Sequence, residues 1–425
     1  MPSINSLSPG LDTARRLFEQ LATQTADSPG VTRASFGEGE ALAHAMVITE
    51  AKRIGLEHRK DAIGNLYITL PGIDRKAPRL MIGSHLDSVP HGGNYDGAAG
   101  VLAGLALLEE LSENPAPAFD ITVMAIRAEE MIWFPEHYIG SRAAFGLLPT
   151  DTATRVQRAD TRRTLADHMR DNGLDPNYIS TAQSTLDAED IRCFIELHIE
   201  QGPVLIENDK PVGIVTKIRG NKRYRYCHIQ GQTTHAGGVP RKSRYDALLA
   251  GVNLVSELET QWIEMENTGH DLVLTIGQFC TDGKQHGITK VPGRIDFTLD
   301  FRSSCQNTLL SFDQFLQDRS AHIAKQRQVS IELGRSTAAS AAVMDETLIA
   351  ELADSAYLCG VPTMLLPSGG GHDSAVFAGQ NIPTALLFIR NENGSHNPEE
   401  SMEFEDFAAA FKVLLNWTSS AICKG

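Results

Sequence analysis

Residues 97–114 read GAAGVLAGLALLEELSEN, and they lie between two apolar runs, RLMIGSHLD (79–87) and DITVMAIRAEE (120–130). The length of 97–114, its Ala and Leu content and its acidic end are typical of a helix, whereas each flanking run is short, apolar and polar at its end. Alternation of strand, helix and strand predicts an α/β sheet. In open sheets of this kind ligands bind at the carboxyl ends of the strands, which is where the polar residues fall.

The same pattern recurs in three more runs, namely CFIELHIEQ (193–201), TMLLPSGGGHD (363–373) and TALLFIRNENGSH (384–396). Each is predicted to be a buried strand with polar residues at its carboxyl end. Together the five runs predict an α/β domain with a mixed sheet, helices on both faces and a site along one edge of the sheet.

Residues 212–334 carry a different pattern, in which two helices alternate with four strands. The predicted order is strand, helix, strand, strand, helix and strand, the signature of a ferredoxin-like domain. The segments are 223–231, 243–261, 272–279, 294–302, 307–324 and 329–334. Because this block is self-contained, we expect a ferredoxin-like domain (212–334) inserted into a catalytic domain built from 1–211 and 335–425, and 425 residues suffice for two domains.

Composition and charge restrict the classes of function. The formal net charge of −15 argues against a nucleic-acid partner, which requires clustered Lys and Arg. The longest apolar run, 97–108, is too short to cross a bilayer, and the N-terminus, MPSINSLSPGLDTARRLFEQL, lacks the features of a secretory signal. The six cysteines form no CxxC motif, which indicates neither a disulfide framework nor a zinc knuckle. We therefore expect a cytoplasmic protein without a nucleic-acid or membrane partner.

The first polar cluster is GSHLDSVPHGGNYDG (83–97), which holds His85, Asp87 and Asp96. Alternate residues of a strand point to the same side, so Asp87 is placed to orient His85 rather than to bind a metal itself. A hydrogen-bonded polar loop explains an isolated HxD pair more simply. From this cluster alone, both alternatives stay open.

Glu129 and Glu130 end the apolar run 120–130 as adjacent carboxylates, which is costly beside a core unless a cation or a proton offsets them. Adjacent strand residues point apart, so one could bind a metal while the other acts as general base; a solvated loop starting at Glu129 is the alternative. His198 and His396 follow two further predicted strands. Histidines and carboxylates at the strand ends of one sheet suit a pair of divalent ions, zinc foremost.

Seven motifs follow one another between residues 83 and 400: HLDSVPHGGNYDG, EE, ELHIEQGPVLI, GQTTHAGGVPRKSRYDAL, DFR, SGGGHDS and GSHNPEE. In this order the chain resembles the M20 metallopeptidase superfamily, and within it the branch of zinc-dependent amidohydrolases that includes N-carbamoyl-L-amino acid amidohydrolase, β-ureidopropionase and allantoate amidohydrolase. The resemblance implies a catalytic domain with two divalent metal ions, zinc by preference with manganese, cobalt or nickel as alternatives. It also implies an inserted ferredoxin-like lid domain through which the chain forms a homodimer.

The resemblance also implies roles for single residues. It implies a general base at Glu129, an orienting carboxylate at Asp87 and, at His235, a histidine that reaches the active site of the partner subunit and stabilises the oxyanion. Substrate contacts are implied for Gln201 and for Arg302, whose guanidinium suits a bidentate clamp on an α-carboxylate. The implied metal ligands are His85, Asp96 as the bridge, Glu130, His198 and His396.

The chain departs from the branch at two places. Residues 131–134 read Met-Ile-Trp-Phe where the branch usually has Gly-Ser-Arg-Phe, and Thr289 stands where an asparagine usually precedes the VPG turn. Both departures are expected to touch the substrate pocket rather than a metal ligand. Thr289 is therefore a candidate for substrate binding. His372 is a further candidate, because its loop SGGGHDS (368–374) offers free backbone N–H groups and the resemblance implies that this loop lies near the site. For Trp133, packing in the core behind the site is an equally good interpretation.

These observations predict a metal-dependent hydrolase of a linear, non-peptide C–N bond, which acts on an N-carbamoyl-amino acid or a related ureido acid with a carboxylate. Two alternatives remain. One is an aminoacylase or dipeptidase of the same superfamily, which cleaves an N-acyl or peptide bond. The other is a binding protein that keeps the fold without catalysis, and the complete set of ligands and base argues against it.

Overall fold

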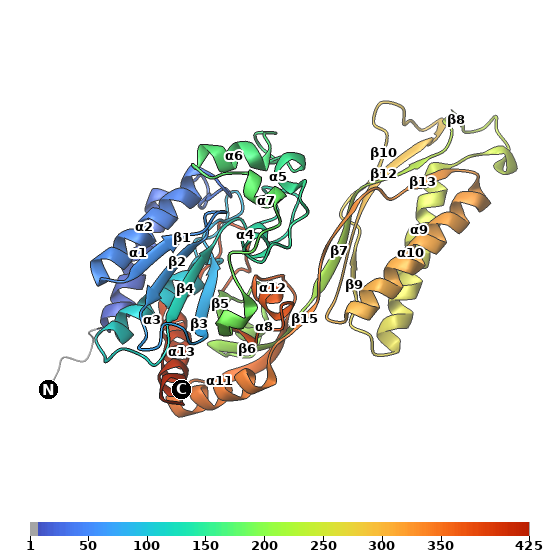
Figure 1. The fold of residues 1–425 in the computed structure, drawn as a ribbon. Coiled ribbons are helices and arrows are strands. Elements are labelled where there is room, and N and C mark those ends of the chain that lie inside the picture. The colour runs from blue at the N-terminus through green and yellow to red at the C-terminus, as the bar shows by residue number, and fades with distance from the viewer. Residues whose placement is uncertain (1–6, 425) are drawn as a thin grey trace. The chain divides into compact units, whose positions relative to one another are not determined.

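The structure is a computed structural model that describes residues 7–424, and its chain divides into two compact units (Figure 1). Unit 1 is formed by the described residues up to Ile218 together with those from Ala342 onward, and unit 2 is Arg219–Ala341. The sequence predicts boundaries at 212 and 334, but residues 212–218 and 342–343 pair within the sheet of unit 1, which moves both boundaries along the chain. Part of the N-terminal stretch in which no secretory signal is expected lies outside the described residues.

Among the described residues, unit 1 has twelve helical segments, one of them the short 3-10 helix η1, and strands on each side of the insertion, in the following chain order. The elements before the insertion are α1 (Pro9–Gln24), α2 (Glu38–Ile54), β1 (Glu57–Lys60), β2 (Leu66–Leu70), β3 (Arg79–His85), α3 (Ala98–Ser112), β4 (Ile121–Ile126), α4 (Ile139–Ala144), α5 (Thr152–Arg155), α6 (Leu165–Asp171), α7 (Asn177–Ser180), η1 (Ala188–Asp190), β5 (Ile191–Ile199), α8 (Val204–Glu207) and β6 (Val212–Ile218). Those after it are β15 (Ala342–Val343), α11 (Glu346–Cys359), β16 (Thr363–Ser368), α12 (Ser374–Ala378), β17 (Thr384–Ile389) and α13 (Phe404–Lys424).

A nine-stranded mixed sheet forms the centre of unit 1, with strand order β1-β2-β4-β3-β5-β17-β6-β15 and with β16 paired to β6. Within this sheet, the neighbouring strands β4, β3, β5 and β17 all run parallel to one another. β1, β2 and β15 pair antiparallel with their neighbours. The mixed α/β fold predicted from the sequence is confirmed, and the four parallel strands end at the same edge of the sheet.

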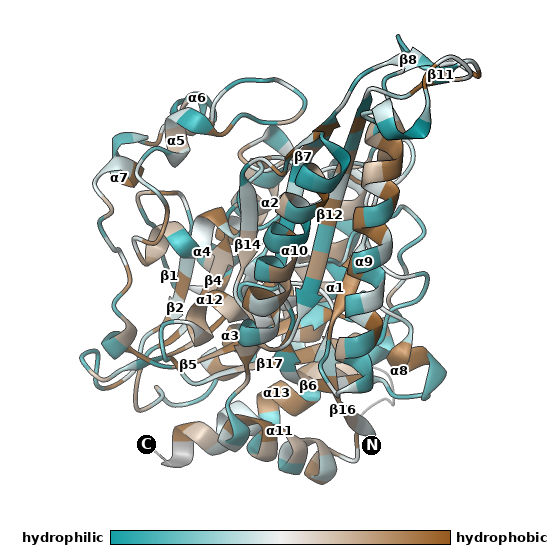
Figure 2. Cartoon of the chain, turned by 90° about the vertical axis from the view of Figure 1, so that its right-hand side faces the viewer, coloured by the Kyte–Doolittle hydropathy of each residue, from teal (hydrophilic) through white to brown (hydrophobic). Residues whose placement is uncertain are grey.

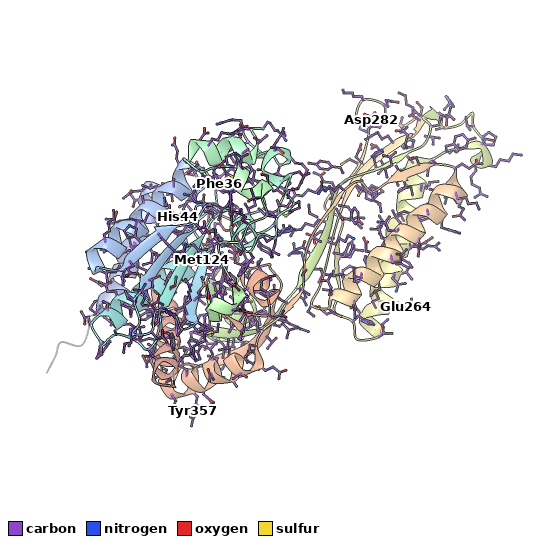
Figure 3. All side chains as sticks on the ribbon, in the orientation of Figure 1. Phe36, His44, Met124, Glu264, Asp282 and Tyr357 are labelled. Carbon is purple, nitrogen blue, oxygen red and sulfur yellow. The ribbon has the colours of Figure 1, made fainter. Side chains whose placement is uncertain are left out.

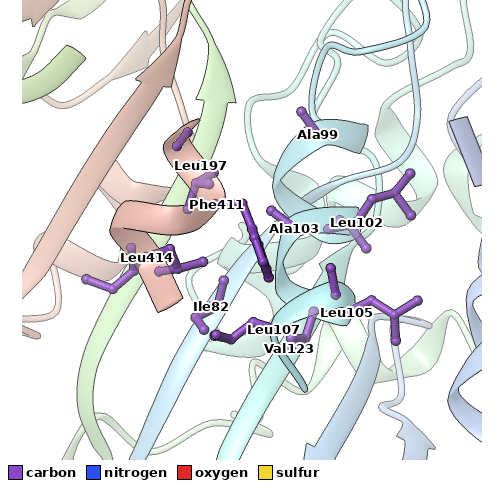
Figure 4. Close-up of a cluster of buried hydrophobic side chains, with 14 of the residues drawn as sticks. Ile82, Ala99, Leu102, Ala103, Leu105, Leu107, Val123, Leu197, Phe411 and Leu414 are labelled. Atoms are coloured by element: carbon purple, nitrogen blue, oxygen red, sulfur yellow. The ribbon is translucent and has the colours of Figure 1, made fainter. Parts of the chain in front are cut away.

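The two faces of this sheet are buried against different helices. Leu80, Ile82 and Val123 face a cluster that α1, α2, α3, α11 and α13 complete, and Figure 4 shows side chains of α3 and α13 gathered over Ile82 and Val123. Met81 and Met124 alternate with them along the strands and face the opposite side, with α4 and α12. Figure 3 shows Met124 in the interior of the unit. Helices therefore cover both faces.

The predicted helix at 97–114 is α3 (Ala98–Ser112), and it is apolar on nearly all sides because other helices and the sheet surround it. The predicted strands at 79–87 and 120–130 end earlier, at His85 and Ile126. Their polar tails are therefore loops at the edge of the sheet. Within residues 7–424, no helix is long and apolar enough to cross a membrane.

Unit 2 is an antiparallel sheet covered on one face by two helices (Figure 1). Strand order is β10-β12-β7-β13, with β9 paired to β12 and β14 to β7. The predicted strand at 272–279 is split into β9 and β10. The elements are β7 (Gly220–Gln230), β8 (Thr234–His235), η2 (Arg241–Ser243), α9 (Ala247–Asn267), β9 (Val273–Thr275), β10 (Phe279–Thr281), β11 (Lys290–Val291), β12 (Arg294–Ser303), α10 (Gln306–Arg327), β13 (Ser330–Glu332) and β14 (Ser336–Ala339).

The two helices of unit 2 are amphipathic. Leu254 and Leu258 of α9, and Phe312 and Leu316 of α10, are buried at helical spacing against the sheet. The outer sides mix polar residues with exposed apolar ones such as Val252 and Ile263 of α9 and Leu310 of α10, and both helices carry teal and brown residues in Figure 2. Asp246 caps α9 by accepting the N–H of the third residue of the helix. Unit 2 thus has its own hydrophobic core.

Candidate active site

Four neighbouring parallel strands bring the predicted ligands to one edge of the sheet of unit 1. His85 is the last residue of β3, and His198 lies at the end of β5. Glu129 and Glu130 follow β4, and His396 lies in the loop after β17. Because parallel neighbours end at the same edge, residues that are far apart in the sequence meet there.

Asp96 lies between two of the histidines. Its Oδ1 is 3.3 Å from Nε2 of His85 and 3.1 Å from Nε2 of His198, and the two Nε2 atoms are 3.5 Å apart. All three side chains are buried. The approach requires glycine at position 97, where φ is +66° and a Cβ atom would lie 2.4 Å from the ring of His85. These three side chains converge closely enough to hold a metal ion.

A second ligand group shares Asp96 with the first. Oδ2 of Asp96 is 3.7 Å from Nε2 of His396, which is 3.5 Å from Oε1 of Glu130. Oε1 of Glu130 is buried and has no hydrogen-bond donor among the described residues. A buried carboxylate oxygen in this situation is stabilised by a cation. Asp96 presents one oxygen to each group, which fits a carboxylate that bridges two ions.

The charges of these side chains interact strongly. Burial lowers the pKa of His85, but the carboxylates of Asp87 and Asp96 raise it well above its ordinary value. Burial raises the pKa of Asp96, but two neighbouring histidines hold it well below its usual range. Burial also raises the pKa of Glu130 well above its ordinary value, and the carboxylates of Asp96 and Glu129 add to the effect. Negative charge is crowded at this edge, and divalent cations are the groups that would offset it.

Glu129 lies beside the two groups that share Asp96. Its Oε2 is 3.9 Å from Nε2 of His85, and its side chain is 13% exposed. Burial, opposed by the charge of His85, raises the pKa of Glu129 to about 7. A carboxyl group with this pKa both accepts and returns a proton near neutral pH. Glu129 with His85 and Glu130 is a third combination close enough to hold an ion.

Glu129 and Glu130 lie in a loop and not on the predicted strand. β4 ends at Ile126, and Ala128 has a φ of +54° in the left-handed region. The buried carboxylate of Glu40, in the first turn of α2, accepts the N–H of Ala128 at 2.9 Å and holds this turn. The directions of the two glutamate side chains are therefore set by this turn, not by the strand alternation that the sequence predicts.

Asp87 connects the two glutamates to His85. Its Oδ1 accepts the N–H of Glu129 at 3.2 Å and lies 3.4 Å from Nδ1 of His85. Its Oδ2 accepts the N–H of Glu130 at 3.1 Å and the O–H of Ser35 at 2.5 Å. One buried carboxylate thus fixes the main chain of Glu129 and Glu130 and contacts the ring of His85.

Gln201 is hydrogen-bonded to a residue of the ligand groups, whereas His372 packs against one. Nε2 of Gln201 donates to Oδ2 of Asp96 at 2.9 Å. His372 is buried and packs edge-on against His198, with ring centroids 4.5 Å apart, and its Nε2 is 2.9 Å from Oγ of Ser368. Burial, together with the charge of His198, lowers the pKa of His372 well below its ordinary value. The structure brings Gln201 to the carboxylate of Asp96 and places His372 against the ring of His198.

His235 and Thr289 lie together at one end of unit 2. His235 in β8 pairs with Lys290 of β11, and the N–H of the residue after His235 donates to the main-chain oxygen of Thr289 at 2.8 Å. Nδ1 of His235 accepts the N–H groups of Gly237 and Gly238 at 3.1 and 2.9 Å. Because Nδ1 is an acceptor, the neutral ring carries its proton on Nε2. The exposed side chain of His235 can therefore donate a hydrogen bond to an anion.

Arg302 lies near the opposite end of β12. It pairs with Asn221, whereas Arg294 at the start of the strand pairs with Gln230, on the side of His235. The stretch of strand between Arg294 and Arg302 is on the order of 25 Å long. Within unit 2, the structure therefore does not bring His235 and Arg302 together. In the same strand, Nε of Arg302 donates to the carboxylate of Asp300 at 3.1 Å.

Glu400 is a residue of the site that sequence reasoning missed. Its Oε1 accepts the N–H groups of Tyr95 and Asp96 at 2.8 and 3.2 Å, and its Oε2 lies 2.8 Å from Oγ of Ser395. Burial, with the charge of Asp96, raises the pKa of Glu400 to about 7. Glu400 therefore ties the loop of Asp96 to the loop of His396. Nothing in GSHNPEE distinguishes it from Glu399, which is exposed.

The departure at residues 131–134 places one apolar side chain in the core and leaves another exposed. Trp133 is buried among Phe36 and Phe134, and its indole N–H donates to the main-chain oxygen of Ser88 at 2.7 Å. Packing behind the site is therefore the correct interpretation of Trp133. Ile132 is 49% exposed.

Comparison with known proteins gives consistent matches over most of the chain. Residues 81–419 match the sequence profile described as peptidase family M20/M25/M40. The chain is 34% identical over 406 residues to N-carbamoyl-L-amino acid amidohydrolase of Geobacillus stearothermophilus, covering 94% of this chain and 95% of that protein. It is 33% identical over 364 residues to allantoate amidohydrolase of Escherichia coli, covering 85% of each. An amidase of the hydantoinase/carbamoylase family from Burkholderia multivorans has a similar structure, with a TM-score of 0.81, 27% identity and coverage of 96% of this chain and 98% of that one.

Proposed function

The chain belongs to peptidase family M20/M25/M40, and from this premise we propose that it is a metal-dependent amidohydrolase. Its proposed substrate is a small carboxylate with a linear, non-peptide C–N bond, namely an N-carbamoyl-amino acid or a related ureido acid. The observation that carries the proposal is Asp96, whose two oxygens face two separate ligand groups next to the carboxyl group of Glu129. The proposed type of bond is supported by similar proteins that are named as amidohydrolases.

Two divalent ions, zinc by preference, are assigned to this site. The first ligand group is His85, Asp96 and His198, and the second is Asp96, Glu130 and His396. Imidazole and carboxylate ligands in this mixture suit zinc, and manganese, cobalt and nickel are the alternatives. When bound, such ions polarise a carbonyl group and lower the pKa of water.

Glu129 is the proposed general base and acid. It takes a proton from the attacking water and later delivers it to the leaving nitrogen, and its carboxyl group, 3.9 Å from the ring of His85, lies beside the ligand groups where such a water would bind. Asp87 holds Glu129 through the main chain, so that the position of the base depends on a residue that does not itself react. For a carbamoyl substrate, water addition and C–N cleavage yield an amino acid, ammonia and carbon dioxide.

Unit 2 is proposed to be a ferredoxin-like lid through which two chains form a homodimer. Its order of strands and helices supports the first part. Arg302 lies near the end of β12 that is far from Arg294, and Arg294 pairs with Gln230, shortly before His235 in the chain, so one small substrate cannot touch both His235 and Arg302 within one unit 2. We assign His235 to the oxyanion in the active site of the partner subunit, with Thr289 beside it, and Arg302 to the substrate carboxylate.

A substrate panel tests the proposal. The metal-loaded enzyme is assayed with N-carbamoyl, N-acyl and ureido acids, and released ammonia and free carboxylic acid are measured separately. Ammonia from N-carbamoyl or ureido acids is the expected result. Release of carboxylic acid from N-acyl acids without any ammonia would instead identify an aminoacylase, and no turnover with metal bound would identify a binding protein.

A further inference from the structure

Arg33 is a fully buried cation beside the ligand groups, and the proposed reaction does not use it. The residue lies between α1 and α2, and its side chain is 0% exposed. It faces the segment 86–95, here called the ligand loop, which joins His85 to Asp96. Burying a guanidinium is costly unless hydrogen bonds and opposite charge compensate for the lost water.

Both ends of the ligand loop are bonded to Arg33. Its Nε donates to the main-chain oxygen of Leu86 at 2.7 Å. Its Nη1 and Nη2 donate to the side-chain and main-chain oxygens of Asn94 at 3.1 and 3.2 Å. The main chain of Arg33 also exchanges two hydrogen bonds with Ser88, each 2.9 Å long. Leu86 directly follows one ligand and Asn94 lies two residues before another, so a single planar side chain fixes the distance between the two ends of the loop.

The positive charge of Arg33 interacts electrostatically with several carboxylates of the ligand groups and of the residues around them. Its three side-chain hydrogen bonds named above end on carbonyl oxygens, which leaves the charge to act at longer range. Burial lowers the pKa of Arg33, and four carboxylates oppose this effect: Glu400, Asp96, Asp87 and Glu130. An arginine side chain keeps its charge in proteins. Arg33 is therefore a permanent positive charge beside crowded carboxylates.

We propose that Arg33 is a positioning residue of the metal centre. It holds His85 and Asp96 at the spacing of ligands before a metal binds, and it offsets part of the repulsion among the carboxylates. The inference rests on the proposed metal centre. Because His85 belongs to the first of the two proposed ligand groups and not to the second, a loosened ligand loop weakens metal binding to the first group more than to the group of Asp96, Glu130 and His396.

Two substitutions separate the hydrogen bonds of Arg33 from its charge. Arg33→Lys keeps the charge but replaces the planar fork by a single ammonium, and Arg33→Met removes both. Arg53→Lys is the matched control, because Arg53 links α2 to α1 and α3 through Thr13 and Glu109, away from the ligand loop. Each metal-free protein is titrated with Zn²⁺ in competition with a chromophoric chelator. Thermal unfolding is measured on the same samples. The variants His85→Ala and His396→Ala are titrated in the same way, and the Zn²⁺ affinity that each one loses is assigned to the ligand group of that histidine.

The Zn²⁺ affinity that depends on His85 is expected to fall about 10- to 100-fold in Arg33→Lys, the usual effect of losing a partner behind a ligand. This affinity should fall further in Arg33→Met and should not fall in Arg53→Lys. In both Arg33 variants, the Zn²⁺ affinity that depends on His396 should fall less than the affinity that depends on His85. Wild-type affinity in both Arg33 variants, or an equal loss in Arg53→Lys, overturns the inference. If Arg33→Met does not fold, Arg33→Lys decides. If the wild-type protein binds no Zn²⁺, the proposed function fails first and the inference fails with it.

Discussion

Asp87→Asn is the substitution that tests most locally how the turn of Glu129, the proposed base, is held. The carboxylate of Asp87 accepts two main-chain N–H groups, from Glu129 and Glu130, one on each oxygen. An asparagine amide has one oxygen and one NH₂ group. In either orientation, the NH₂ group faces one of these N–H donors, and the remaining bond loses the charge of its acceptor.

The expected magnitude follows from these two hydrogen bonds. A hydrogen bond to a charged acceptor contributes about 1.5–3 kcal/mol. A change of 1.4 kcal/mol corresponds to a factor of about ten in an equilibrium constant. The main-chain N–H groups of Glu129 and Glu130 should therefore exchange with solvent deuterium about 10- to 100-fold faster in Asp87→Asn, because local opening becomes easier by that factor.

Hydrogen exchange followed by mass spectrometry of a peptide over residues 127–131 is the assay, performed on metal-free protein. Ser35→Ala is the graded control, because it removes only the O–H bond to Oδ2 of Asp87. It should accelerate exchange of the same peptide less than Asp87→Asn does. Wild-type exchange in Asp87→Asn would refute the reasoning that Asp87 holds the turn of Glu129 and Glu130.

Four further outcomes are expected. Glu129→Gln should bind both metals while kcat falls about 10²- to 10⁴-fold, and near wild-type turnover in the metal-loaded variant contradicts its role as base. Glu400 has a folded pKa of about 7 against an ordinary 4.5, so its contribution to the stability of metal-free protein is complete below pH 4.5 and is lost as the pH rises through 7. The Tm of the metal-free wild-type protein, measured with a chelator present, should therefore fall between pH 5 and pH 8, and Glu400→Gln should make this fall smaller. An unchanged dependence of Tm on pH in the variant would refute the role assigned to the Glu400 carboxyl group. Mixing His235→Ala with Glu129→Gln subunits should restore about a quarter of wild-type activity in a randomly assorted dimer, and verified heterodimers without activity exclude action in the partner's site. Arg302→Lys should raise KM about tenfold with little change in kcat, because a bidentate clamp is lost; an unchanged KM contradicts the assignment.

The strands of the sheet in unit 1 and the polar residues at their ends could be predicted from the sequence, because both produce local sequence patterns. Apolar runs that end in polar residues predicted β3, β4, β5 and β17, and the parallel pairing of these strands then brings His85, His198 and the loops of Glu129 and His396 together. Strand ends were less predictable. The turn at Ala128 depends on the distant carboxylate of Glu40, which no local pattern reveals.

The residues that support the ligand groups could not be predicted for a similar reason. Arg33 and Glu400 are buried charged residues whose partners lie in other segments of the chain. In the sequence they are indistinguishable from solvated arginines and glutamates, because burial of an isolated charge arises only from tertiary contacts. The unit boundary shifted for a related reason, since only pairing with β16 and β17 shows that residues 212–218 belong to the sheet of unit 1.

The central claim is that two divalent ions at Asp96 and a base at Glu129 hydrolyse a C–N bond outside a peptide. The most direct measurement is ammonia release from an N-carbamoyl-amino acid while metal-free protein is titrated with zinc. We predict no ammonia without metal and a rate that levels off at two zinc ions per chain. Full activity in metal-free protein, or saturation with zinc and no ammonia from any N-carbamoyl or ureido acid, would contradict the claim.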